Sequence, residues 1–222
     1  MKKGERKKQQ RALKKRSEKH RSHSPGAVPR LVMSSPHIRE ARAYPIQSCW
    51  VQEGWEEAGI AVVVVARRQP NGRLLFGTYM VDLYCLGLKD TYARTDIAEG
   101  DFRPRYLDQI YAANPPVRIL PELAHEIIYG GIAYAAQYGF KPHADFRLTR
   151  HILDLPEAHR PTGKVVFGYE GKPFYVAGPH DRVKAIMAQL RRTAGEGNYT
   201  YLMPVEELST DLFEADSEED EE

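Results

Sequence analysis

Hydrophobic residues in the middle of the chain form two neighbouring runs that predict a β-hairpin. Ile60 to Arg68 is a β-branched run, and Arg73 to Leu86 is a second apolar stretch. Pro70-Asn71-Gly72 joins them, and Asn-Gly favours the positive φ angles of a type I′ turn. With that turn, Ala66 is expected to pair with Gly77. Both faces of the hairpin are mainly apolar, so we expect other elements to cover both.

Two later segments have the periodicity of amphipathic helices. Residues 121–138 start at a proline, end before Gly139 and place their apolar residues on one side. Gly130 and Gly131 inside this helix each cost about 1 kcal/mol relative to Ala. We therefore expect neighbouring atoms to pack closely against them. Residues 179–193 predict the second helix, which ends at Gly195.

The remaining apolar segments are shorter and give weaker patterns. Residues 164–177 predict a second hairpin that turns at Glu170-Gly171, and residues 199–203 predict one more strand. Residues 145–155 fit either a strand or a short helix that starts at Asp145, and we favour the helix. Residues 44–57 are interpreted as an irregular lead-in that packs over the sheet.

These elements predict an α+β fold: a single domain with two β-hairpins and two main amphipathic helices, flanked by disordered charged ends. We place a basic disordered arm at 1–40, the globular domain at 41–205 and an acidic disordered tail at 206–222. The longest apolar run, Ile60 to Ala66, is shorter than the roughly 20 residues that cross a bilayer. Residues 1–30 do not resemble a secretory signal. We therefore expect a cytoplasmic protein with no membrane partner.

Cysteine and histidine usage indicates neither a disulfide framework nor a metal site. Cys49 and Cys85 are the two cysteines, and neither belongs to a Cys-x-x-Cys pair. Apart from His20 and His23, no His or Cys pair shows the short i, i+3 or i+4 spacing that zinc sites commonly use. We predict no metal and no cofactor, and we interpret both cysteines as small buried residues.

Charge is concentrated at the two ends of the chain. Residues 1–24 hold eleven Lys or Arg against two Glu, a net charge of +9, whereas residues 206–222 hold ten carboxylates and no Lys or Arg. A dense cationic run without aromatic residues is typical of polyanion binding, because each neutralised phosphate releases condensed counterions. The predicted nucleic-acid-binding residues are Lys2, Lys3, Arg6, Lys7, Lys8, Arg11, Lys14, Lys15, Arg16, Lys19 and Arg21.

Both charged ends also have simpler interpretations. The arm can act as a solubilising segment or as an address signal. The tail can act only on solubility, or it can occupy the arm at high effective concentration until nucleic acid displaces it. The second interpretation predicts that removal of residues 206–222 tightens nucleic-acid binding.

Four sequence blocks resemble a family of uncharacterised bacterial proteins. The blocks are YPIQSCW, FGTYMVDLYCLGLKD, LAHEIIYGGIAYAAQYGFKPHADF and FGYEGKPFYVAGPHD, and together they span most of residues 44–201. The resemblance implies a bacterial cytoplasmic setting. It implies no catalytic residue, since that family has no established activity.

Asp82 is the most suggestive single residue, because it interrupts the apolar segment from Tyr79 to Tyr84. One hypothesis places it in a metal-binding carboxylate cluster of the nuclease kind. The favoured interpretation is a structural Asp bonded to the backbone or to an Arg at a strand end. The other acids available for such a cluster are Asp90, Asp96, Asp145 and Asp181.

Three histidines are candidates for acid–base chemistry near neutral pH: His125, His143 and His180. No Ser/His/Asp or Cys/His order accompanies them, so a boundary or capping role is favoured for each. The catalytic residues, if the chain has any, are unknown from sequence.

The sequence therefore predicts a non-catalytic protein that binds RNA or a ribonucleoprotein such as the ribosome through its basic arm, with RNA favoured over DNA. The alternatives are a metal-dependent hydrolase acting on nucleic acid and a protein–protein interaction module. An exposed apolar patch would favour the latter.

Overall fold

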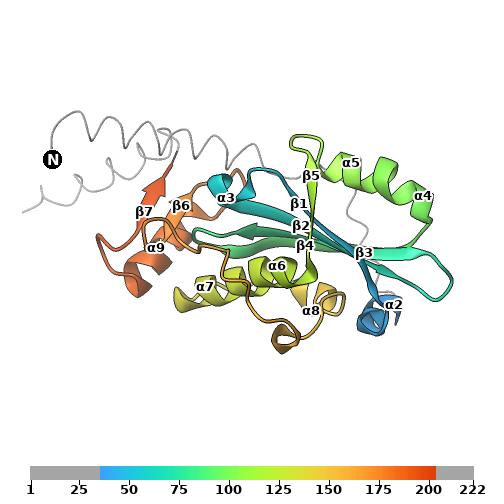
Figure 1. Ribbon diagram of the computed structural model, residues 1–222. Helices are drawn as coiled ribbons and strands as arrows, with labels where there is room; N and C mark the ends of the chain where they lie inside the picture. Colours follow the sequence, from blue (N-terminus) through green and yellow to red (C-terminus); the bar gives the residue numbers. More distant parts are fainter. Residues whose placement is uncertain (1–35, 204–222) are drawn as a thin grey trace, which may run out of the picture.

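A computed structural model describes residues 36–203 and shows an α+β fold built on one antiparallel sheet (Figure 1). The sheet has the strand order β4-β3-β2-β1-β5. Each neighbouring pair of strands is antiparallel. The strands are β1 (Ile46–Gln52), β2 (Ile60–Arg68), β3 (Leu74–Asp82), β4 (Gly87–Ile97) and β5 (Pro116–Ile119).

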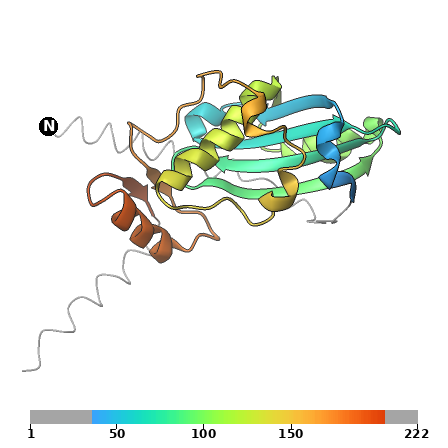
Figure 2. The ribbon, with the colours of Figure 1, turned by 90° about the horizontal axis from the view of Figure 1, so that it is seen from below.

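Helices cover both faces of the sheet, as the two apolar faces of the hairpin predict (Figures 1 and 2). Along β2, alternate residues enter different cores: Val63 and Val65 belong to one cluster, and Val62 and Val64 belong to the other. The first face packs against α6 (Pro121–His125), the π-helical turn η3 (Glu126–Gly130) and α7 (Gly131–Gln137), which follow one another without a break. The second packs against α4 (Glu99–Phe102), the π-helical turn η2 (Arg103–Leu107) and α5 (Asp108–Ile110).

A smaller unit lies at one end of the sheet. Strands β6 (Phe174–Val176) and β7 (Thr200–Leu202) are parallel, and α9 (Val183–Thr193) connects them. Its core contains Tyr175 and Leu190, together with Cys85 from the turn after β3. The remaining short elements are α2 (Pro36–Arg39), η1 (Ala41–Ala43), α3 (Trp55–Ala58), α8 (Phe146–Thr149) and η4 (Pro156–Ala158).

The β2–β3 hairpin exists, but its predicted register is wrong by one residue. Ala66 pairs with Phe76 rather than with Gly77. The N–H of Gly72 donates to the carbonyl of Gln69 at 2.9 Å, and Gly72 has φ +79°. Asn71 does not have a positive φ. Together these features indicate a three-residue loop that ends in a left-handed glycine, which adds one residue to the predicted two-residue type I′ turn.

Two other strand predictions are corrected by the structure. Residues 46–52 are not an irregular lead-in but strand β1, which lies between β2 and β5. The predicted hairpin at 164–177 is limited to a tight turn with a Tyr169–Lys172 bridge, where Glu170 and Gly171 both have positive φ. Beyond that turn, β6 pairs with β7 and not with residues 165–168.

The helix predictions agree more closely with the structure. The helix expected at 121–138 spans 121–137, and a short helix follows Asp145, although the Asp145 side chain does not cap it. The helix predicted from residue 179 starts later, at Val183. Within residues 36–203, no helix has the length and apolar character needed to cross a bilayer.

The folded region includes residues that we assigned to the arm. Pro36–Arg39 is helical, and Ile38 is 1% exposed and packs into the first core cluster. The domain boundary expected at residue 41 therefore lies earlier, by Pro36. The rest of the predicted arm and the predicted tail lie outside the described residues.

Candidate functional site

A group of ionisable side chains, led by the buried Arg67, lies where the end of β2 meets residues 152–154. Arg67 is 2% exposed. Its Nε donates to the carbonyl of Ile152 at 2.6 Å, and another guanidinium nitrogen donates to the carbonyl of Tyr44. Its third nitrogen forms an ion pair with Asp154. One guanidinium thus ties β2 to two segments that are distant in sequence.

Asp154 uses both carboxylate oxygens. Oδ1 accepts from Arg67, and Oδ2 accepts from Nε2 of His159 at 2.8 Å. Burial alone would raise the pKa of Asp154, but the hydrogen bonds from His159 and Arg67 outweigh burial and hold this pKa below its ordinary value of 3.8. The carboxylate therefore stays charged and joins a cation on one side to an imidazole on the other.

His125 contacts the same group from α6. Its Nδ1 lies 2.8 Å from the carbonyl of Pro121, which can only accept, so Nδ1 carries the proton. Its Nε2 accepts the backbone N–H of Asp154 at 2.9 Å. Burial, first of all, lowers the pKa of His125 and favours this neutral tautomer. His125 thus links α6 to the backbone of Asp154, which is a structural role and not a catalytic one.

Distances alone would allow a metal ion here. His125, Asp154 and His159 offer ligand atoms that all lie within 4.8 Å of one another. Among residues 36–203, this is the group of three His, Cys, Asp or Glu side chains that lie close enough to hold a metal ion. The lone pair of His125 Nε2, however, already points at the N–H of Asp154. A cation could bind there only if that backbone group moved, so the geometry favours a structural network.

Asp82 lies at the end of β3 and is fully buried. Its Oδ1 accepts the backbone N–H groups of Tyr84 at 2.9 Å and Cys85 at 3.0 Å. The other oxygen, Oδ2, is buried and has no hydrogen-bond partner. The contacts agree with a structural Asp that holds the turn between β3 and β4.

The other acids of the hypothetical nuclease cluster occupy separate contacts. Asp90 and Asp145 lie on either side of His143, at 4.0 and 3.8 Å. Asp181 forms a half-buried ion pair with Lys89, and Asp96, near the end of β4, forms an exposed ion pair with Arg73. The structure therefore does not gather these acids around Asp82, and the third candidate histidine, His180, is exposed beside Asp181.

Both cysteines are buried and unbridged. Burial raises the pKa of Cys49 to about 12 and the pKa of Cys85 well above its usual value. Neither thiol forms the thiolate that nucleophilic or metal chemistry needs near neutral pH. The prediction that they are small core residues is confirmed.

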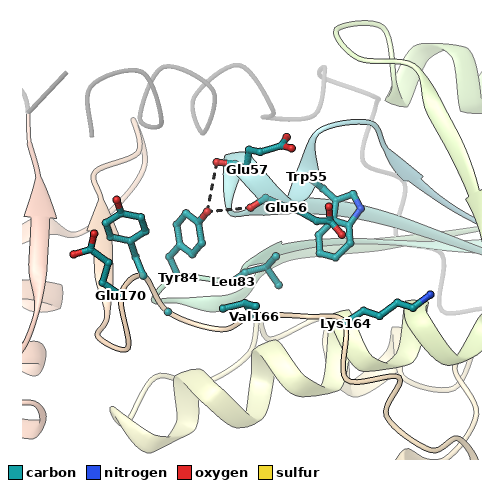
Figure 3. Close-up of a pocket in the computed structure, with 10 residues that line it drawn as sticks. Trp55, Glu56, Glu57, Leu83, Tyr84, Lys164, Val166 and Glu170 are labelled. Atoms are coloured by element: carbon teal, nitrogen blue, oxygen red, sulfur yellow. Dashed lines mark hydrogen bonds between the residues drawn. The ribbon is translucent and has the colours of Figure 1, made fainter. Parts of the chain in front are cut away.

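A cavity of about 530 Å³ lies between α3 and the segment 164–170 (Figure 3). Trp55, Leu83 and Tyr84 form its apolar part, and Glu56, Glu57, Lys164 and Glu170 contribute charged groups. The Tyr84 hydroxyl donates to the carbonyl of Glu56 at 3.0 Å, so this polar group serves the packing of α3 against the turn. Sequence reasoning did not identify this cavity.

The eleven predicted nucleic-acid-binding residues, from Lys2 to Arg21, all lie outside the described residues. Asp154 and His159 were not identified from sequence either, because neither belongs to an amphipathic pattern or a motif. The chain matches no protein-family model, no curated protein and no solved structure. The resemblance to a bacterial family therefore stays a prediction.

Proposed function

We propose that this protein binds RNA or a ribonucleoprotein such as the ribosome in the cytoplasm, mainly through the basic arm at residues 2–21, and that it catalyses no reaction. The observation that carries the proposal is the segregation of charge, +9 in residues 1–24 against ten carboxylates in residues 206–222. Such an arm gains affinity from counterion release and requires no specific sequence in its partner.

The folded domain supports this proposal through the positions of its reactive groups. Arg67, Asp154 and His125 hold distant segments together, and Asp82 holds a turn. Most of the chemistry-bearing side chains that the sequence offers thus serve internal bonds. We therefore assign the domain the role of a scaffold that carries the arm.

The test compares the full chain with a full-length variant in which the eleven Lys and Arg residues from Lys2 to Arg21 are changed to Gln. Binding of a fluorescent single-stranded RNA is followed by anisotropy over a series of salt concentrations. We expect the wild type to bind with a steep salt dependence and the variant to lose most of its affinity at low salt. The same measurement with DNA of equal length and sequence tests the preference for RNA.

Two results would overturn the proposal. One is equal RNA affinity for wild type and arm variant. The other is cleavage of the RNA by the wild type in the presence of Mg²⁺ or Mn²⁺ that Asp82→Asn abolishes, because this would replace a binding role by a catalytic one.

A further inference from the structure

Helix α2 is the first element of the described fold, and it lies beside α8 on the surface of the domain (Figures 1 and 2). Arg39 ends α2, and Arg150 follows the last residue of α8. Both side chains are exposed. Arg42 follows Arg39 by three residues, and its guanidinium group donates to the backbone carbonyl of Arg150. Three arginines are thus brought together at the point where the arm joins the fold.

These arginines are held in place by the folded chain. Ile38, the residue before Arg39, is buried in the first core cluster. Arg42 donates from Nε to the carbonyl of Leu153 at 2.8 Å and from a terminal nitrogen to the carbonyl of Arg150 at 3.0 Å. The guanidinium group of Arg42 is therefore anchored and would lose less conformational entropy on binding a ligand than a free side chain would. Arg39 and Arg150 are fixed in position through the backbone.

The positive charge of the three arginines is largely uncompensated. Arg42 spends its hydrogen bonds on neutral carbonyls, and among residues 36–203 no carboxylate forms an ion pair with Arg39, Arg42 or Arg150. Asp154 is already paired with Arg67 and His159. Glu40 is the acid beside the group in sequence, and it accepts a long hydrogen bond of 3.5 Å from Tyr44.

The pKa of His151 is affected by the positive charge of all three arginines. Burial first, and then the charges of Arg150, Arg42 and Arg39, lower the pKa of this imidazole. The histidine is half-buried beside Arg150. All three guanidinium groups therefore act on one point of the surface.

We infer that Arg39, Arg42 and Arg150 form a phosphate-binding surface that takes the sugar–phosphate backbone of single-stranded RNA and extends the contact of the basic arm on to the folded domain. Guanidinium groups suit this ligand because their planar donors match phosphate oxygens in pairs. The inference rests on the proposed function. It adds that the RNA contacts the domain as well as the arm.

The test is the full-length double variant R39Q/R150Q, which leaves the two hydrogen bonds of Arg42 in place. Single-stranded RNA binding is measured as a function of salt for this variant, the wild type and the arm variant. Loss of two phosphate contacts is expected to reduce the slope of log K against log salt by about 1.4, at roughly 0.7 for each contact.

The matched control is R103Q/R105Q, which also removes two exposed arginines but lies on the opposite face of the sheet, in η2. We expect its RNA affinity and salt slope to equal those of the wild type. Equal urea unfolding midpoints for the two double variants and the wild type would show that a lower slope in R39Q/R150Q comes from lost contacts.

The outcomes separate this inference from the proposed function. If R39Q/R150Q binds RNA like the wild type while the arm variant loses binding, the surface is not a phosphate site and the proposed function stands. If the wild type binds no RNA, both fail. If it prefers vesicles of phosphatidylserine to RNA and R39Q/R150Q reduces that binding, the surface takes a membrane and the RNA assignment is overturned.

Discussion

At the scale of single residues, buried polar side chains in this protein mostly bond to the backbone. Gln52 donates to the carbonyl of Ile60 and accepts the N–H of Val62, and the Tyr79 hydroxyl donates to the carbonyl of Thr149. Arg67 does the same with Ile152 and Tyr44. These bonds satisfy groups that would be costly to leave unpaired and also fix segments that lack regular structure.

Substitution of Asp82 is expected to affect stability. Asp82→Ala leaves the N–H groups of Tyr84 and Cys85 without their acceptor, at about 1–3 kcal/mol for each. We expect the free energy of unfolding to fall by about 2–6 kcal/mol. Asp82→Asn keeps an oxygen for both donors and is expected to lose less. Urea denaturation followed by circular dichroism measures both.

The control for Asp82 is Glu196→Ala, which removes a carboxylate whose side chain is 83% exposed. Its free energy of unfolding is expected to stay within about 0.5 kcal/mol of wild type. Equal stability of Asp82→Ala and Glu196→Ala would contradict the structural role that we assign to Asp82.

The lowered pKa of His125 predicts a dependence of stability on pH. As pH falls below about 6.5, the unfolded chain binds this proton before the folded chain does. The contribution of His125 is therefore fully present above pH 6.5 and is lost as pH falls toward its lower folded pKa. The pKa of Asp154 is lowered from 3.8, so its own contribution changes only under more acidic conditions.

Urea unfolding at pH 7.5, 6.5 and 5.5 tests this expectation. The wild type should lose stability across the series, and His125→Gln should lose less of it. His180→Gln is the control, because it removes a histidine whose side chain is exposed. An identical pH dependence in His125→Gln and wild type would exclude His125 as the source.

At the scale of elements, the helix from α6 to α7 depends on close approach at its glycines. A Cβ on Gly131 would lie 2.4 Å from Cγ1 of Val81, a fully buried residue of β3. A Cβ on Gly130 would lie 2.3 Å from the ring of Phe167. The expectation that neighbours pack against both glycines is confirmed, and it explains why two poor helix formers occupy the middle of this helix.

Gly131→Ala is expected to lower the free energy of unfolding by about 1–3 kcal/mol, because the clash with Val81 outweighs the better helix propensity of Ala. Gly100→Ala is the matched control: Gly100 is also helical, and nothing lies within 4 Å of its added Cβ. That variant is expected to gain up to about 1 kcal/mol. Equal shifts in the thermal midpoints of both variants would contradict the packing explanation.

The elements with the clearest patterns were predictable from sequence, and the others were not. The helix at 121–137 has limits and periodicity of its own, and the β2–β3 hairpin has two strongly apolar strands. Strand β4 alternates poorly because Lys89, Asp90 and Arg94 lie at half-buried positions. Strand β5 has four residues and depends on its pairing with β1. Such strands are determined by their neighbours and carry little local signal.

The candidate site shows the same limit. Asp82 could be singled out because a charged residue inside an apolar stretch is visible in the sequence. Asp154 and His159 could not, since their roles come from contacts with Arg67 and His125, which lie far away along the chain. The sequence thus identified Asp82 as a residue with a structural role, but it did not predict the hydrogen-bond network around Asp154.

At the scale of the whole molecule, the folded domain separates two segments of opposite charge. In the sequence the cationic segment ends at Arg21, and residues 22–35 hold one further cation, Arg30. Arg39, Arg42 and Arg150 add positive charge at the N-terminal end of the described fold. The anionic segment at 206–222 carries ten carboxylates. A tethered polyanion competes with RNA for the same cations at an effective concentration that can reach the millimolar range.

Full-length variants in which the ten carboxylates of residues 206–222 are changed to Gln or Asn test this competition. We expect single-stranded RNA to bind on the order of tenfold more tightly at low salt, because the intramolecular competitor is removed. The gain should shrink toward 0.15 M salt, where charges are screened beyond about 8 Å. In the arm variant the same tail substitutions should have little effect, since the tail then has few cations to occupy. Equal RNA affinity with and without the tail charges at low salt would show that the two ends act independently.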